Sequence, residues 1–180
     1  MGGRRDGRLP VRTPALRTGG GAGIRKSVGP KCFRLKWRMT DAASLIAALQ
    51  LQPHPEGGWY RETWRAEAPA GERASATAIL FLLEAGQRSH WHKVDAAELW
   101  LFHAGSPLRL DTSASDAGPV QSVRLGPDVL AGDQPQARIE AGAWQAAEAD
   151  RGWSLVSCIV SPGFEFAGFT LAPLDWEPAG

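Results

Sequence analysis

The chain has 180 residues, a formal net charge of +1 and two cysteines, which suits one domain with its own hydrophobic core and offers no disulfide framework. Residues 1–38 hold eleven Lys or Arg and one acidic residue, so the rest of the chain is acidic, with nine basic against eighteen acidic residues. This acidic balance argues against nucleic-acid binding. No apolar stretch is long enough to cross a membrane, and the low cysteine content suits a reducing compartment, so we expect a cytoplasmic protein.

The first 38 residues are rich in Gly, Arg and Pro and show neither helical nor strand periodicity. Such a segment cannot bury enough apolar surface to fold alone, so we expect residues 1–38 to be a disordered basic extension. Its composition is shared by organellar transit peptides and by nucleic-acid-binding arms. A further interpretation is an over-extended gene start, with translation beginning at Met39. Residues 39–176 then form a single domain.

A short helix is predicted at the start of this domain. Thr40 or Asp41 can cap its N-terminus, and apolar residues recur at helical spacing over residues 45–49. Pro53 ends the pattern, so the helix has about three turns.

The remainder of the chain predicts strands. Short segments rich in β-branched and aromatic residues alternate with Gly, Pro, Asp and Ser punctuation. We expect them at residues 58–66, 75–83, 89–94, 97–105, 107–113, 120–126, 136–141, 144–149, 153–160 and 164–172. Short strands at this spacing are typical of an antiparallel sandwich or a small barrel, so the fold class is all-β.

One segment, SHWHKVDAAELW, carries candidate chemistry. Successive side chains of a strand point to opposite faces, so His90 and His92 are expected to share one face and to meet the same ligand. Glu98 can join them from the next strand. Imidazole and carboxylate groups bind divalent transition metals, and they also act as acids and bases.

These residues belong to a recognisable motif. Gly86, His90, His92, Glu98 and Gly105 resemble the first cupin motif, including the six-residue gap between its Glu and its last Gly, and the segment EAGAWQ, residues 140–145, resembles the second. The phrases LQPHPEGGWYRETW, SHWHKVDAAELWLFHAG, AGAWQAA and SPGFEFAGF are similar to the Cupin_5 family over residues 45–171.

The resemblance implies a double-stranded antiparallel β-helix, that is, a cupin jelly-roll barrel. The short N-terminal helix would precede it. It further implies an internal pocket, a homodimer and a barrel similar to that of the sugar-nucleotide epimerases. It implies no single reaction, because the family is largely uncharacterised and the fold hosts many chemistries.

The same resemblance leaves the metal question open. The cupin metal site is completed by a histidine in the second motif, and here that position is Gln145, whose amide oxygen is a weaker ligand. A three-ligand site for Fe, Mn, Ni or Zn, formed by His90, His92 and Glu98, is one interpretation. The alternative is a pair of hydrogen-bonded pocket histidines without an ion. By alternation, His103 is a structural or surface residue.

The epimerases with this barrel use a histidine base and a tyrosine acid. By resemblance, His92 or His90 would abstract a proton next to a carbonyl, Glu98 would orient the imidazole and Tyr60 would donate a proton. Tyr60 is the only tyrosine of the chain, and a sheet-face residue with a bonded hydroxyl is the alternative for it.

Further residues are predicted to contact a small-molecule ligand. His54 and Glu56 precede a double glycine in a loop that can close over the pocket. Alternation groups Tyr60 with Glu62 and Trp64, so only one of Arg61 and Glu62 can face the pocket. The predicted ligand-binding set is His54, Glu56, Arg61, Trp91, Trp100 and Gln145.

The aromatic and remaining polar residues have simpler interpretations as well. One of Trp91, Trp100 and Trp144 is expected to stack on a ligand, whereas in an aromatic-rich barrel all three can be core residues. Glu165 is expected to be exposed or to lie at a subunit interface, and Cys158 to be buried.

The leading functional hypothesis is a cupin-fold small-molecule-binding protein that acts as a carbohydrate or nucleotide-sugar isomerase or epimerase through histidine acid–base chemistry. A metal-dependent cupin oxygenase or lyase is the first alternative. The second is a ligand-binding or sensing module without turnover.

Overall fold

The computed structural model describes residues 41–149 and 151–179, and the predicted basic extension lies outside this part. Its one α-helix, α1 (Ala42–Leu49), begins after Asp41, whose carboxylate accepts a hydrogen bond of 2.6 Å from the Ser44 N–H. The predicted cap at Asp41 is therefore confirmed. The helix is shorter than predicted, because Gln50 adopts a left-handed conformation and ends it after eight residues.

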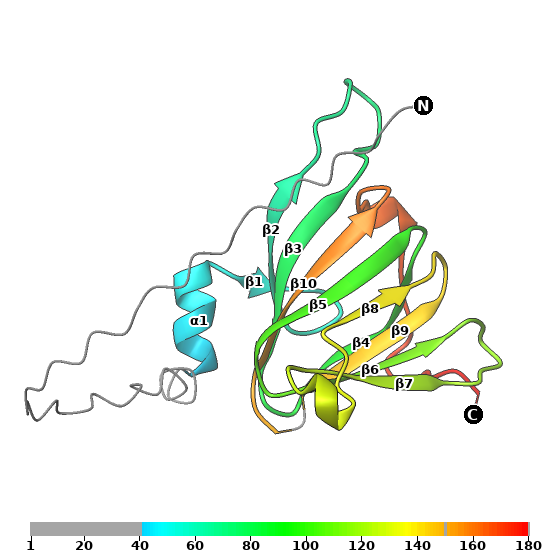
Figure 1. The fold of residues 1–180 in the computed structure, drawn as a ribbon. Helices are drawn as coiled ribbons and strands as arrows, with labels where there is room; N and C mark the ends of the chain where they lie inside the picture. The colour runs from blue at the N-terminus through cyan, green and yellow to red at the C-terminus, as the bar shows by residue number, and fades with distance from the viewer. Residues whose placement is uncertain (1–40, 150, 180) are drawn as a thin grey trace, which may run out of the picture. The chain divides into compact units, whose positions relative to one another are not determined.

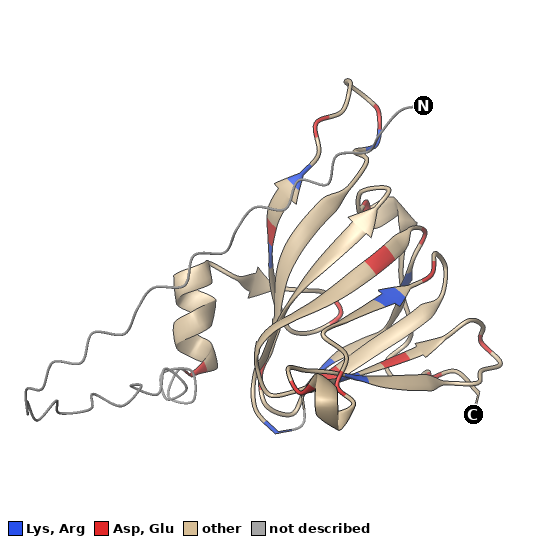
Figure 2. Cartoon of the chain, in the orientation of Figure 1, with Lys and Arg blue, Asp and Glu red and all other residues tan. Residues whose placement is uncertain are grey.

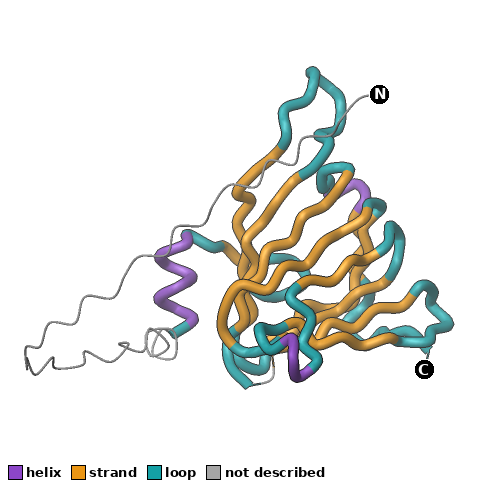
Figure 3. The backbone as a smooth tube through the Cα atoms, in the orientation of Figure 1, coloured by secondary structure: helices purple, strands orange, loops and turns teal. Residues whose placement is uncertain are grey.

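In residues 41–149 and 151–179, all other regular structure is antiparallel β-sheet with two short 3₁₀ turns, which confirms the all-β prediction (Figures 1 and 3). One sheet contains, in spatial order, β1 (Gln52–Pro53), β2 (Trp59–Arg65), β3 (Thr77–Leu83), β10 (Ser154–Ser161), β5 (Ala97–Gly105) and β8 (Gln136–Ile139). The other contains β11 (Phe169–Leu171), β4 (Gln87–Val94), β9 (Trp144–Ala149), β6 (Leu108–Ser113) and β7 (Gln121–Leu125).

Most predicted strands form at nearly the expected positions, with two differences. The two-residue strand β1 was not predicted. Only Phe169–Leu171 of the last predicted segment is a strand, because the 3₁₀ turn η4 (Phe166–Gly168) precedes it. The other 3₁₀ turn of the described residues, η3 (Val129–Ala131), lies between β7 and β8. No helix in the described ranges is long and apolar enough to cross a membrane. Acidic residues outnumber basic ones on these strands and loops (Figure 2).

The main core lies between the two sheets. It joins Phe81, Trp100 and Val156 of the six-stranded sheet to Leu110 and Ala147 of the five-stranded sheet. Fully burying a large apolar side chain such as Phe81, Leu110 or Val156 contributes about 1.5–3 kcal/mol. A second cluster lies on the outer face of the five-stranded sheet, where the segment after β11 covers it.

Two irregularities in the strands decide which side chains face the interior. On β4, Ser89 pairs with Ala147 but His92 pairs with Gln145, so β4 advances three residues while β9 advances two. On β2, one extra residue lies between Glu62 and Trp64 relative to β3. Each extra residue is a β-bulge, after which the alternation of faces is reversed.

Candidate functional site

A cavity of about 350 Å³ opens at one end of the two sheets. Part of its wall is apolar, formed by Ile79, Val94, Val160 and the three phenylalanines Phe164, Phe166 and Phe169. Its polar lining residues are Gln52, His54, Glu56, Tyr60, Glu62, Arg65, Thr77, His92, Glu98, Cys158 and Glu165. A cavity that combines apolar surface with convergent polar groups is typical of a small-molecule site.

The loop between β1 and β2 brings Glu56 into this cavity. The loop is closed by a hydrogen bond of 3.0 Å from the His54 N–H to the Gly58 carbonyl, and the His90 N–H donates to the Glu56 carbonyl at 2.7 Å. Gly57 has a φ of +105°, and a Cβ atom there would collide with the Arg88 carbonyl oxygen. Glycine is therefore required for the loop to lie against β4.

The Glu56 carboxylate is held between two imidazoles. Its Oε2 atom lies 3.3 Å from His54 Nδ1 and 3.3 Å from His92 Nε2, and its Oε1 atom accepts a 2.9 Å hydrogen bond from the Ser89 hydroxyl. Burial by itself raises the pKa of this carboxyl group. The His92 charge and the hydrogen bonds from His54 and Ser89 outweigh that effect, so its pKa lies below the ordinary value.

The orientation of the His92 ring follows from its second nitrogen. Nδ1 lies 2.8 Å from the His90 carbonyl oxygen, which can only accept, so Nδ1 carries a proton. In the neutral ring, Nε2 is therefore the basic nitrogen, and it is the atom that faces Glu56. The His92 residue is 2% exposed, which excludes bulk water from this contact.

A second carboxylate, Glu98, is held by a different set of groups. The Gln145 amide donates to Glu98 Oε2 at 2.6 Å, and the Trp100 indole N–H donates to the Gln145 oxygen at 2.9 Å. Because an indole can only donate, this pair fixes the amide orientation. Burial raises the pKa of Glu98, and the hydrogen bond from Gln145 and the His92 charge only partly offset it.

Cys158 lies beside Glu98 in the cavity wall. Burial raises the pKa of its thiol well above the ordinary value, and the nearby Glu98 and Glu56 carboxylates raise it further. The prediction that Cys158 is buried is confirmed, but its contact with the cavity was not predicted.

The expectation that His90 and His92 share a face is wrong, because the bulge in β4 lies between them. His90 does not line the cavity, and its Nε2 atom donates to the Pro173 carbonyl at 2.7 Å. The predicted metal set of His90, His92 and Glu98 therefore does not converge. The Gln145 oxygen is already bonded to Trp100, and among the described residues no group of three His, Cys, Asp or Glu is arranged to bind a metal ion.

The β2 prediction is half right. Tyr60 and Glu62 line the cavity, but the bulge after Glu62 turns Trp64 outward, where it is 52% exposed, and brings Arg65 inward instead. Arg61 faces away and contacts Gln50 at 3.4 Å, so its predicted ligand contact is wrong.

None of Trp91, Trp100 and Trp144 lines the cavity. Trp91 and Trp144 belong to the outer cluster, and Trp100 belongs to the main core. The expected stacking of one of them on a ligand is therefore not supported, whereas the core interpretation is. Gln145 contacts Glu98 rather than the cavity. His103 is exposed and bonded to Ser157, as predicted for a structural or surface histidine.

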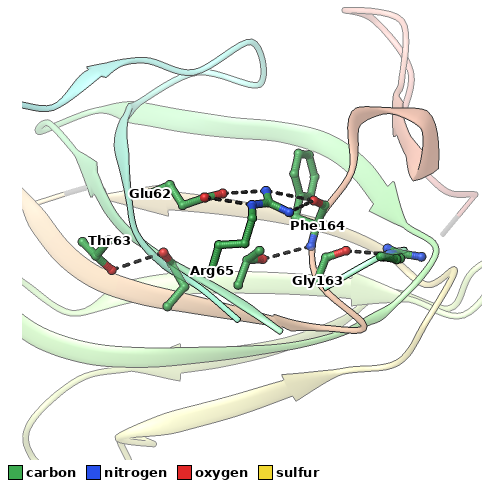
Figure 4. Close-up of polar contacts among 8 residues, drawn as sticks. Glu62, Thr63, Arg65, Gly163 and Phe164 are labelled. Carbon is green, nitrogen blue, oxygen red and sulfur yellow. Dashed lines mark hydrogen bonds and ion pairs between the residues drawn. The ribbon is translucent and has the colours of Figure 1, made fainter. Parts of the chain in front are cut away.

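The rim of the cavity contains residues that sequence reasoning did not assign. Arg65 forms two bonds to Glu62 and also donates to the Phe164 carbonyl (Figure 4). Glu165, on the segment that precedes β11, lines the same cavity. The Glu62 and Arg65 spacing carries no sequence signal for this pairing, since residues three apart on a regular strand face opposite ways.

Comparison with known proteins places the chain in a family context. The model of Cupin_5, described as Cupin superfamily (DUF985), matches residues 43–172. No curated protein matches the sequence significantly.

Two solved structures are similar in both sequence and fold. Protein SO0799 from Shewanella oneidensis is 39% identical, with a TM-score of 0.70, over 74% of this chain and 85% of that one. A hypothetical protein from Leishmania major is 34% identical, with a TM-score of 0.66, over 74% and 88% of the two chains. An oxalate decarboxylase from Bacillus subtilis shares only the fold, at 16% identity and a TM-score of 0.52 over 67% and 29%. The predicted cupin jelly-roll fold is confirmed.

Proposed function

Since this chain belongs to the Cupin_5 family of the cupin superfamily, we propose that it is a small-molecule-binding cupin that isomerises or epimerises a carbohydrate by proton transfer. The observation that carries this proposal is the contact between His92 Nε2 and the Glu56 carboxylate at the floor of the cavity. His92 Nδ1 is fixed by the His90 carbonyl and Nε2 lies beside Glu56, so a substrate that reaches Nε2 within the cavity can pass its proton to an imidazole whose protonated form this carboxylate stabilises.

The proposed step moves one proton. His92 Nε2 takes a proton from the carbon next to the substrate carbonyl, the C–H electron pair forms an enolate, and the resulting imidazolium is stabilised by Glu56. Delivery of a proton to the other face of the same carbon, by a donor on that face, gives epimerisation. Return of the proton to the former carbonyl carbon, with loss of the proton from the neighbouring hydroxyl and re-formation of the carbonyl there, gives isomerisation. Glu56 thus takes the supporting role that we had assigned to Glu98.

A proton donor is needed at the substrate oxygen. Tyr60 lines the same cavity, with its ring edge-to-face against His54 at a centroid distance of 4.5 Å. Glu98 is a second candidate, because its raised pKa favours the protonated, hydrogen-bond-donating form. Two carboxyl groups whose pKa values shift in opposite directions within one cavity divide naturally into a base partner and an acid.

Solvent exchange tests this function directly. The native protein is incubated with a panel of free aldoses and ketoses in D₂O, and loss of the C2 proton signal is followed by NMR. We expect exchange with at least one sugar, and a fall of about 100-fold or more in the His92→Asn variant. The His103→Asn variant is the matched control, because that histidine is exposed and outside the cavity.

Two outcomes contradict the proposal. One is the absence of exchange with every sugar, and the other is exchange that persists in His92→Asn. Binding without exchange would favour a ligand-binding or sensing module, since a bound ligand stabilises the fold without turnover.

A further inference from the structure

The charge of the cavity limits the ligands that it can accept. Four glutamates line it, Glu56, Glu62, Glu98 and Glu165, and Arg65 is the one lysine or arginine among its described lining residues. Phosphate groups are bound in proteins mainly by arginine, lysine and backbone N–H groups. The availability of Arg65 therefore decides whether a phosphorylated ligand can bind.

The Arg65 guanidinium, whose side chain is 43% exposed, is paired with groups of the protein through all three of its nitrogens. Its Nε and one Nη donate to the two Glu62 oxygens at 3.0 and 2.7 Å, and both Nη atoms lie 3.3 Å from the Phe164 carbonyl oxygen (Figure 4). This fork-to-fork pairing is the same geometry with which arginine binds a phosphate, so Glu62 occupies the place that a phosphate would take.

A second arginine, Arg73, does not line the cavity but contacts the same segment in a similar way. Arg73 pairs with both oxygens of Asp95, at 2.9 and 2.7 Å, and donates to the Gly163 carbonyl at 2.6 Å. The segment that carries Gly163 and Phe164 is held further by the Phe164 N–H, which donates to Thr77 at 2.9 Å. The rim is therefore a built structure in which both arginines hold backbone carbonyls and carboxylates.

We propose that the cavity takes a small uncharged hydroxylated ligand and excludes its phosphorylated counterpart, and that Glu62 determines this specificity by occupying Arg65. This ligand would bind at the site described under the proposed function, and calling it a substrate rests on that function. The volume of about 350 Å³ agrees with it, because this is near the low end of the roughly 300–1,000 Å³ range of ligand sites. Of the two substrate classes considered from sequence, free carbohydrate is favoured over nucleotide sugar.

Binding of inorganic phosphate, measured by calorimetry at constant ionic strength, tests the role of Glu62. The native protein is expected to show no saturable binding. The Glu62→Gln variant, which frees the guanidinium, is expected to bind phosphate saturably, with a Kd at least about tenfold below the highest phosphate concentration at which the native protein shows no binding. The Glu62→Gln/Arg65→Gln double variant should lose this gain. Glu67→Gln is the matched control, because Glu67 is an exposed acid that does not line the cavity.

A second measurement does not depend on any variant. The native protein is titrated with free hexoses and with the same hexoses carrying a phosphate. Tighter binding of the free sugar supports the inference, whereas equal or tighter binding of the phosphorylated sugar overturns it. Failure of Glu62→Gln to gain phosphate binding overturns the role of Glu62. Because these are binding measurements, they are separate from the proton-exchange experiment, and either result can fail alone.

Discussion

Replacing Gln145 with leucine tests the hydrogen-bond chain that orients Glu98. Gln145 is 1% exposed and joins the Trp100 indole N–H to the Glu98 carboxylate through bonds of 2.9 and 2.6 Å. Leucine fills nearly the same volume but leaves both partners buried without a bond. Each unsatisfied buried group costs about 1–3 kcal/mol, so the free energy of unfolding should fall by about 2–6 kcal/mol. This is a large part of the roughly 5–15 kcal/mol of a typical domain.

Urea denaturation of the native protein and the variant measures this loss, and pH provides a second signature. Removal of the Gln145 donor raises the pKa of Glu98 further, so the loss of stability should increase as the pH rises above the ordinary carboxyl range. Combining the change with Trp100→Phe removes the unsatisfied indole. The double variant should therefore be more stable than the sum of the two single losses by about 1–3 kcal/mol.

Gln121→Leu is the matched control, because Gln121 is an exposed strand residue whose replacement should change stability by less than about 0.5 kcal/mol. A loss below about 1 kcal/mol in Gln145→Leu, or additive behaviour of the double variant, would refute the assigned amide orientation and the chain itself.

Three further predictions follow from the same cavity. Glu56→Gln should be less stable than the native protein at neutral pH, and this deficit should shrink as the pH falls through the lowered Glu56 pKa. Glu98→Gln should show the opposite trend and gain stability relative to the native protein as the pH rises above about 4.3. Urea midpoints measured between about pH 3 and pH 8 test both trends. In a Cys32→Ser background, the Cys158 thiol should react far more slowly with a thiol reagent at pH 8 in the folded protein than in urea; equal rates would contradict its burial and raised pKa. Gly57→Ala should lower the unfolding free energy by about 1–3 kcal/mol more than Gly71→Ala, because both residues have positive φ but only Gly57 approaches another backbone. Equal losses of stability in thermal unfolding would contradict the close contact of Gly57 with β4.

The fold was largely predictable because local patterns agree with the tertiary structure. The Asp41 cap and most strands were identified from capping chemistry, strand composition and turn residues, and the spaced cupin motifs supplied the topology. The short β1 strand was missed because two residues carry no periodicity. The helical turn η4 was missed because the aromatic residues around it have the composition of a strand.

The site was predicted less completely, and both bulges explain the errors. Strand alternation placed His90 on the face of His92 and Trp64 on the face of Tyr60, and an extra residue in each strand reverses that placement. A bulge depends on pairing with a distant strand, so a pattern within one strand does not reveal it. The position of Glu56 beside His92 depends likewise on a contact between distant segments.

The extra residue in β4 also shows that a potential metal ligand can be present in the sequence and still lie outside the cavity. His90 is still present in the sequence, yet the bulge directs it to the Pro173 carbonyl on the outer side. Deleting Trp91 would restore regular alternation with Ser89 and His92 still on the inner face, and His90 would then lie between them on the outer face. The extra residue therefore sets which positions of β4 face the cavity, so insertions and deletions within a strand, as well as substitutions, decide which side chains of this scaffold can reach a ligand.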